Sequence, residues 1–163
     1  MITTLALTLT LGALAEVGSP APDFSAVDQA GHTQSLKALK GKWIVLYFYP
    51  KDMTSGCTLE AHSFRDLQTD FDKANAVVLG VSSQDAKSHG DFAKSEQLGF
   101  PLLDDHSRTI ADAYGVGSVV PLTGLDKRIT FLIDKAGVIR QVWPSVEPRG
   151  HATEVLKAIQ AKN

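Results

Sequence analysis

Cysteine is nearly absent from this chain of 163 residues, which contains only one, Cys57. A single cysteine excludes an intramolecular disulfide framework and a zinc site built from cysteines. Any disulfide that the chain forms must therefore join Cys57 to another molecule.

The chain also lacks an excess of charge of either sign. It has 16 basic and 18 acidic residues, a formal net charge of −2, and both signs are scattered along the sequence. Nucleic-acid binding needs a concentrated basic surface, so we expect no nucleic-acid partner. Internal repeats, linkers and low-complexity stretches are absent, and 44% of the residues are hydrophobic. A 17.5-kDa chain of this composition can bury one sizeable core, which predicts a single domain.

No basic residue precedes the apolar run from Leu5 to Leu14, and that run is too short to span a bilayer. Within it, Ala13-Leu14-Ala15 has the small-x-small form of a signal cleavage site. We therefore expect residues 1–18 to be an N-terminal extension or a signal segment, and residues 19–163 to be the domain. The predicted compartment is the cytoplasm. The periplasm or export is the alternative if residues 1–15 act as a signal peptide.

Strands and helices alternate along most of the domain. The strongest strand pattern is Trp43–Tyr49, which is apolar on both faces and suits the centre of a covered sheet. A helical segment from Cys57 and the strand Ala76–Ser82 follow, which predicts a parallel pair with a right-handed crossover. Further predicted strands are 24–28, 33–36, 129–134 and 138–143, and further predicted helices are 85–98, 108–114 and 150–161. This order indicates an α/β domain, a mixed sheet with helices on both faces, for which a thioredoxin-like fold is the natural candidate.

Cys57 lies where the buried strand has ended and the helix begins. Phe64, Leu67 and Phe71 follow it at helical spacing, so Cys57 shares the helix face that is directed to the core. A lone cysteine is often only a small buried hydrophobe. A helix N-terminus, however, favours the thiolate.

The helix N-terminus alone does not suffice to ionise this thiol. A free cysteine titrates near pH ~8.5, so a mostly ionised thiol needs a shift of about 2 units, roughly 3 kcal/mol. A helix N-terminus supplies ~0.3–1 kcal/mol and at best ~2. A fixed cation must come from elsewhere in the fold, and arginine suits this role because it does not lose its charge.

Two neighbours of Cys57 favour chemistry at this position. Thr54 lies on an adjacent ridge of the helix, although a simple N-cap role explains it equally well. Gly56 leaves the backbone beside the sulfur open to a small substrate. Thr54-x-x-Cys57 also lacks the first cysteine of a Cys-x-x-Cys motif, which argues against a dithiol oxidoreductase.

Other chemistries find less support in the sequence. In a Cys–His hydrolase His62 would lie about 140° around the helix from Cys57, facing away from it. The other four histidines reach the thiol only through tertiary folding. Asp104-Asp105-His106 lacks the spacing of converging metal ligands, and Gly115-x-Gly117 lacks the third glycine of a dinucleotide-binding loop. We therefore expect no metal and no cofactor.

Pro50-x-x-x-Thr54-x-x-Cys57, after an aromatic strand and before Thr58-Leu59-Glu60, resembles the active-site motif of the peroxiredoxins. The chain is most similar to the peroxiredoxin Q branch, also called bacterioferritin comigratory proteins. The similarity covers nearly everything after residue 20 and includes the segments 22–24, 79–82, 100–103, 128–134 and 150–152.

The resemblance implies a function, with a role for each matching residue. Cys57 is the peroxidatic cysteine, which attacks a hydroperoxide and becomes a sulfenic acid. Thr54 hydrogen-bonds the thiolate and the peroxide, and Pro50 shields them from water. Arg128 supplies the cation that the energy argument requires. Glu60 orients Arg128 from behind, unless it is simply a solvent-facing helix carboxylate.

Trp143 either walls the pocket or packs in the core. The expected activity is that of an antioxidant peroxidase reducing hydrogen peroxide and organic hydroperoxides.

The chain departs from many members of this branch because it has no resolving cysteine. His62 and Ala93 occupy the positions where that second thiol lies in those relatives. The match therefore implies a one-cysteine mechanism with an external reductant, either thioredoxin or glutaredoxin with glutathione. We expect a monomer or a weak homodimer. The alternative is a thioredoxin-fold module without enzymatic activity, such as a binding domain or a holdase chaperone.

Overall fold

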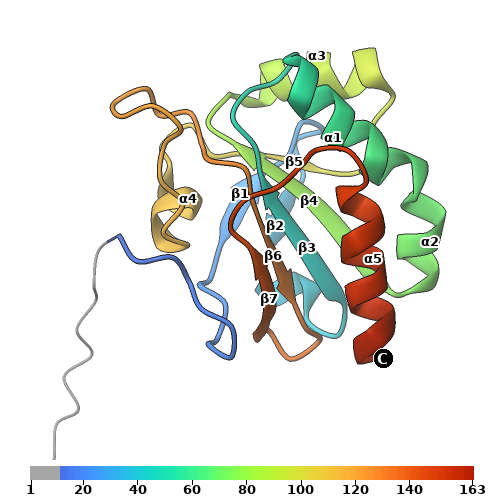
Figure 1. Cartoon of the computed structure of the whole chain (residues 1–163). Coiled ribbons are helices and arrows are strands. Elements are labelled where there is room, and N and C mark those ends of the chain that lie inside the picture. Colours follow the sequence, from blue (N-terminus) through green and yellow to red (C-terminus); the bar gives the residue numbers. More distant parts are fainter. Residues whose placement is uncertain (1–11) are drawn as a thin grey trace, which may run out of the picture.

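A five-stranded mixed sheet forms the centre of the molecule in our computed structural model, which describes residues 12–163 (Figure 1). Its strands are β3 (Trp43–Phe48), β4 (Ala76–Ser82), β5 (Leu102–Asp104), β6 (Ile129–Ile133) and β7 (Ile139–Trp143). They lie in the order β5-β4-β3-β6-β7. The pairs β3–β4 and β4–β5 are parallel, and β6 runs antiparallel to both β3 and β7. All six residues of β3 are buried, as the continuous apolar run predicts.

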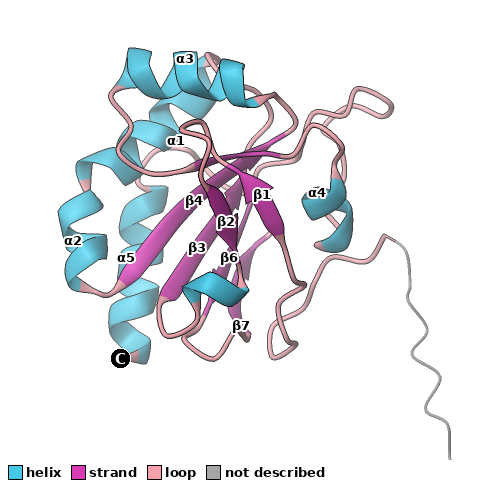
Figure 2. Cartoon of the chain, turned by 180° about the vertical axis from the view of Figure 1, so that it is seen from behind, coloured by secondary structure: helices cyan, strands magenta, loops and turns pink. Residues whose placement is uncertain are grey.

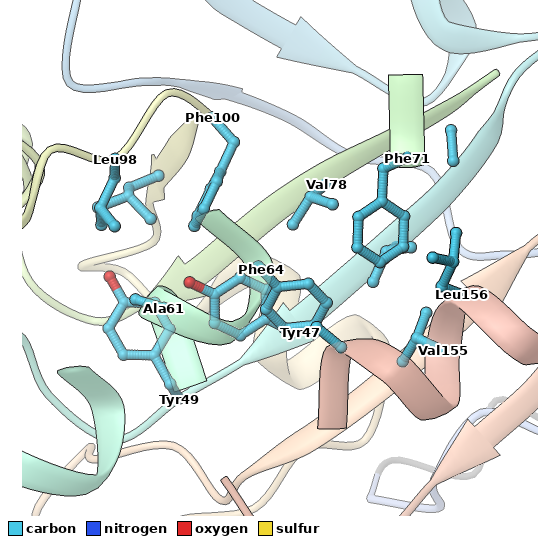
Figure 3. Packing of buried hydrophobic residues seen from close by; sticks show 14 of the residues in the cluster. Tyr47, Tyr49, Ala61, Phe64, Phe71, Val78, Leu98, Phe100, Val155 and Leu156 are labelled. Carbon is cyan, nitrogen blue, oxygen red and sulfur yellow. The ribbon is translucent and has the colours of Figure 1, made fainter. Parts of the chain in front are cut away.

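Four helices cover one face of the sheet. They are α1 (Ser55–Asp66), α2 (Gln68–Lys73), α3 (Ala86–Glu96) and α5 (His151–Lys162). Their apolar side chains form one core cluster with the β3 side chains that point to this face. Tyr47 lies at its centre, where its ring stacks on Phe64 at 4.7 Å between centroids (Figure 3).

The opposite face is covered by smaller elements (Figure 2). They are the antiparallel pair β1 (Ser25–Val27) and β2 (Thr33–Ser35), a 3₁₀ turn at Lys37–Leu39, and α4 (Thr109–Ala113). Together with β3, β4 and β6 they enclose a second cluster, in which Phe48 and Tyr114 both contact Phe131. Helices therefore lie on both faces of a mixed sheet, which confirms the predicted class.

Two elements differ from the sequence-based expectation. The helix after Cys57 does not continue to Phe71 but breaks at Leu67, which ends α1 and precedes α2. This break packs the Phe71 ring against Phe64 at 5.8 Å. β5 was not predicted, because its three residues belong to no local hairpin and are defined by their pairing with β4.

The segment just before the predicted domain boundary packs against the domain. The amide of Ala15 donates to the Tyr114 carbonyl, and the amide of Gly18 donates to the Ile139 carbonyl. Gly115 permits this contact because its φ is +71° and a Cβ there would lie 2.1 Å from the Ala13 carbonyl oxygen. Residues 1–11, and with them most of the apolar run, lie outside the described residues.

Candidate active site

Cys57 is the third residue of α1 and is almost completely buried, with 1% of its surface exposed. β3 delivers the chain to this point, and the loop 50–54 turns it back into the helix. The first helical hydrogen bond runs from the Thr58 amide to the Thr54 carbonyl. The sulfur thus lies in the first turn, where backbone amides lack helical partners and favour negative charge.

The pairing of β3 with β6 brings Arg128 to the same end of the sheet. Phe48 pairs with Ile129, so the residue before β6 meets the loop after β3. The Nη2 atom of Arg128 donates to the Cys57 sulfur at 3.4 Å. The cation that the energy argument required is therefore in contact with the thiol, from 71 residues away in sequence.

Glu60 holds the other side of this guanidinium. Its Oε2 atom accepts from Nη1 of Arg128, and its side chain is completely buried. Burial raises the pKa of Glu60 to about 7, against the opposing effect of Arg128. Glu60 is therefore not solvent-facing. One end of the Arg128 fork binds a buried carboxylate and the other binds the sulfur, which fixes its orientation.

Gly56 leaves room for the guanidinium rather than for the substrate alone. A Cβ at this position would lie 3.2 Å from Nη2 of Arg128, the atom that contacts the sulfur. Any larger residue would press on this contact.

Thr54 and Pro50 lie on the loop that precedes α1, and among the described residues no hydrogen bond joins the Thr54 hydroxyl to the Cys57 sulfur. Thr54 is the N-cap residue of α1 by position, but its hydroxyl makes no capping bond and instead donates to the Lys51 carbonyl at 2.9 Å. The hydroxyl proton is thus engaged, and the oxygen's lone pairs remain available to an incoming O–H donor. Pro50 is half-buried and follows directly on Tyr49 at the end of the strand.

A buried histidine that sequence reasoning did not assign to the site lies near Arg128. Nε2 of His151 lies 2.8 Å from the Thr130 hydroxyl, and burial together with the charge of Arg128 lowers the pKa of His151 to about 4. The imidazole is therefore neutral at pH 7. Trp143 packs edge-on against this ring at 5.5 Å and, partly buried, against the core cluster that contains Cys57.

None of the five histidines hydrogen-bonds to Cys57 in the part of the chain that the structure describes. Their partners are Asp28 for His32, Glu96 for His62, Asp52 for His89, Asp104 for His106 and Thr130 for His151. A Cys–His hydrolase therefore lacks its base. Asp104 and Asp105 are likewise occupied, accepting from His106 and from backbone amides. Within residues 12–163, no cluster of three metal-binding side chains occurs, and no helix is long and apolar enough to cross a membrane.

A surface cavity of about 260 Å³ opens beside Arg128. Val119, Pro144 and Val146 give it apolar walls, and Lys127 and Arg128 give it positive charge. A small molecule with an apolar tail and a polar head would fit this combination.

Comparison with known proteins gives consistent matches over most of the chain. The model of the AhpC/TSA family matches residues 17–142. A putative peroxiredoxin bcp of Coxiella burnetii is 46% identical over 86% of this chain and 96% of its own length. The structure of peroxidoxin BcpB from Mycobacterium tuberculosis superposes with a TM-score of 0.84 at 34% identity, covering 91% of this chain and 98% of that one.

A Xanthomonas campestris bacterioferritin comigratory protein, studied for alkyl peroxide reduction, superposes with a TM-score of 0.81 at 36% identity, over 92% of this chain and 98% of that one. These likenesses confirm the thioredoxin-like fold and the predicted resemblance.

Proposed function

The chain belongs to the AhpC/TSA family, in the branch of peroxiredoxin Bcp and peroxiredoxin Q, and from this premise we propose that Cys57 is its peroxidatic cysteine and Arg128 the activating cation. The protein is a thiol peroxidase by its family. The observation that supports the residue assignment is the contact of 3.4 Å between the Arg128 guanidinium and the buried Cys57 sulfur.

The first step is a displacement on oxygen. The Cys57 thiolate attacks the terminal oxygen of a hydroperoxide ROOH, an S–O bond forms, and the O–O bond breaks. The leaving alkoxide takes up a proton and departs as ROH, and the cysteine remains as a sulfenic acid, oxidised by two electrons. Arg128 stabilises the negative charge as it moves from sulfur to oxygen. The Thr54 hydroxyl oxygen accepts a hydrogen bond from the O–H group of the peroxide and aligns the peroxide for attack. Pro50 excludes water from the sulfur.

The second step needs another molecule because Cys57 is the only thiol of the chain. An external thiol attacks the sulfenic sulfur, releases water and leaves a mixed disulfide. A second thiol then reduces that disulfide and restores Cys57. We propose thioredoxin, or glutaredoxin with glutathione, as the source of these two electrons.

The cavity beside Arg128 supports organic hydroperoxides as substrates in addition to hydrogen peroxide. Its apolar walls suit an alkyl chain, and Arg128, which lines the cavity, also contacts the Cys57 sulfur. The alkyl peroxide reduction studied for the Xanthomonas protein agrees with this assignment.

Peroxide consumption tests the function directly. The assay couples the protein to thioredoxin, thioredoxin reductase and NADPH in one series, and to glutaredoxin, glutathione and its reductase in another. We expect turnover with at least one series and none in Cys57→Ser. Equal rates for wild type and Cys57→Ser in both series would refute the peroxidase assignment and favour a binding module or a holdase chaperone.

We also propose that residues 19–163 form the catalytic domain, that the protein is a monomer or a weak homodimer, and that it acts in the cytoplasm. The contacts of Ala15 and Gly18 with the domain support retention of the preceding segment. N-terminal sequencing of the mature protein tests this: a start after Ala15 would indicate export instead.

A further inference from the structure

A buried acid–base pair joins the loop that leads to Cys57 to helix α3. Asp52 belongs to this loop and has 4% of its surface exposed, and His89 of α3 has none. Nδ1 of His89 lies 2.7 Å from Oδ2 of Asp52. Neither residue hydrogen-bonds to Cys57, Thr54 or Arg128, so the catalytic steps described above leave the pair without a role.

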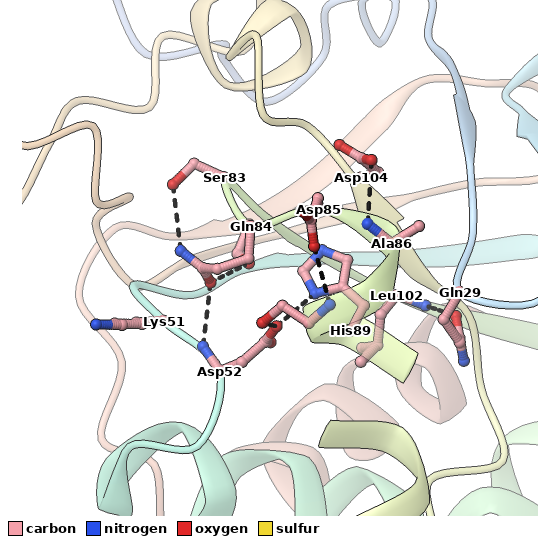
Figure 4. Close-up of polar contacts among 12 residues, drawn as sticks. Gln29, Lys51, Asp52, Ser83, Gln84, Asp85, Ala86, His89, Leu102 and Asp104 are labelled. Carbon is pink, nitrogen blue, oxygen red and sulfur yellow. Dashed lines mark hydrogen bonds and ion pairs between the residues drawn. The ribbon is translucent and has the colours of Figure 1, made fainter. Parts of the chain in front are cut away.

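Asp52 is held on every side. Its Oδ1 atom accepts from the Tyr49 hydroxyl at 2.6 Å, and its Oδ2 atom accepts from the Ser88 hydroxyl at 2.7 Å as well as from His89. The Asp52 amide donates to the Gln84 side chain (Figure 4). Burial by itself raises the pKa of Asp52, but the bonds from His89, Tyr49 and Ser88 keep that pKa below its usual value. Asp52 is therefore a carboxylate.

The partners of His89 define its protonation. Nε2 lies 3.0 Å from the Leu103 carbonyl oxygen, which only accepts hydrogen bonds. Nδ1 faces the carboxylate oxygen that already accepts from Ser88, so that oxygen is poorly placed to donate. Both ring nitrogens must then donate, which makes His89 an imidazolium and the pair a buried, hydrogen-bonded salt bridge.

The loop between this pair and the sulfur is short and strained. Met53 follows Asp52 with a φ of +64°, a left-handed conformation that a non-glycine residue adopts only when its surroundings impose it. Thr54 is then the N-cap residue of α1, and its hydroxyl donates to the Lys51 carbonyl. Asp52 thus lies between Lys51, whose carbonyl holds the Thr54 hydroxyl, and Met53, whose left-handed backbone leads into the helix.

We propose that Asp52 and His89 are positioning residues for the peroxidase reaction: the hydrogen bond between His89 Nδ1 and Asp52 Oδ2 fastens the loop 50–54 to α3 and thereby sets the positions of Thr54 and Cys57. The proposal rests on the proposed function of Cys57. Without the contact with His89, only the hydrogen bonds of Asp52 with Tyr49, Ser88 and Gln84 oppose relaxation of the left-handed Met53 backbone. The loop would then shift Thr54 and the first turn of α1 relative to Arg128, which is anchored separately by Glu60.

Three single variants, the double alanine variant and a control test the proposal. Asp52→Ala and His89→Ala remove one partner each. Asp52→Asn keeps the shape and lets its amide donate to a neutral His89, so the bridge persists without its charge. Asp91→Ala, an exposed carboxylate of α3 that pairs with Lys87, is the control. Stopped-flow measurement gives the second-order rate constant of each folded variant with peroxide.

We expect both alanine variants to react about 10- to 100-fold more slowly, because a misplacement of about 1 Å costs up to roughly 100-fold. The double alanine variant should lose no more than the worse single one. Asp52→Asn and Asp91→Ala should stay close to wild type. In ¹⁵N NMR spectra, His89 should show two protonated nitrogens in wild type and one in Asp52→Asn, a signature that needs no alanine variant to fold.

Several results would overturn the proposal. A His89 ring without a proton on Nδ1 in wild type removes the hydrogen bond to Asp52, and an Asp52→Ala variant that is folded and as reactive as wild type removes the positioning role. An Asp52→Asn variant that is as slow as Asp52→Ala would show that the hydrogen bond between residue 52 and His89 does not hold the loop. A wild-type protein that does not react with peroxide instead refutes the proposed function itself.

Discussion

Arg128→Met tests both roles proposed for Arg128, which are to stabilise the Cys57 thiolate and to stabilise the charge that develops during attack on the peroxide. It keeps an apolar stem of similar length but removes the guanidinium that contacts both Cys57 and Glu60. A pair of unit charges 3.4 Å apart interacts by about 5 kcal/mol at an effective dielectric of about 20. Most of this interaction already stabilises the thiolate before the reaction. Only the part that becomes stronger in the transition state changes the rate of the chemical step.

We expect the rate constant with peroxide to fall by about 100- to 1,000-fold, as on removal of a donor that stabilises a developing oxyanion. Alkylation by iodoacetamide should also slow, because less of the thiol is ionised. The rate constant of Arg128→Lys should lie between those of wild type and Arg128→Met, since an ammonium cannot bridge Glu60 and Cys57 as a planar guanidinium does. Stopped-flow kinetics on the purified variants measures all three.

Stability gives the control for this experiment. Arg128→Met leaves Glu60 buried without its partner, which costs up to about 3–5 kcal/mol unless Glu60 takes up a proton. Arg128→Met with Glu60→Gln removes the stranded charge, so it should regain stability in urea denaturation without regaining activity. The reasoning is refuted if Arg128→Met reacts with peroxide at the wild-type rate, or if the double variant recovers the activity.

Three further changes test other parts of the site. Gly56→Ala should raise helix propensity by up to ~1 kcal/mol but push Arg128 off the sulfur, so thermal melts should show no loss of stability while peroxide reduction slows about tenfold; an unchanged rate would contradict the contact. Because the pKa of His151 is lowered to about 4 in the folded protein, the unfolded chain binds more protons between pH 4 and 6.5, and stability is lost as the pH is lowered through that window. His151→Asn should reduce this loss by up to about 3 kcal/mol between pH 7 and pH 4 in urea titrations, and an unaltered pH dependence would exclude His151 as its source. Thr54→Val should slow peroxide reduction at least about tenfold and Thr54→Ser should restore it, whereas equal rates would show that the hydroxyl is not used.

The sheet was predictable because its strands carry strong local signals. Trp43–Phe48 is apolar throughout and lies at the centre, and the predicted strand Ala76–Ser82 matches β4 residue for residue. The break at Leu67 could not be predicted, since neither proline nor glycine marks it. β5 escaped notice because among the strands it pairs only with β4, whereas the equally short β1 and β2 pair with each other as a local hairpin.

The site divides in the same way. Cys57 was a candidate by its place between strand and helix, its peroxidatic role came from the family resemblance, and the need for a cation followed from energies. Arg128 itself came from a family resemblance, because 71 residues separate it from the sulfur. The pairs Asp52–His89 and Thr130–His151 carry no local motif, and only the folded chain brings their partners together.

The central claim is that the Cys57 sulfur takes the peroxide oxygen, and trapping of the oxidised cysteine tests it most directly. Reduced protein is mixed with one equivalent of hydrogen peroxide in the presence of dimedone, and the modified peptide is located by mass spectrometry. We predict near-stoichiometric dimedone addition at Cys57, with the loss of one peroxide for each thiol. A thiol that remains unmodified while peroxide persists would contradict the account.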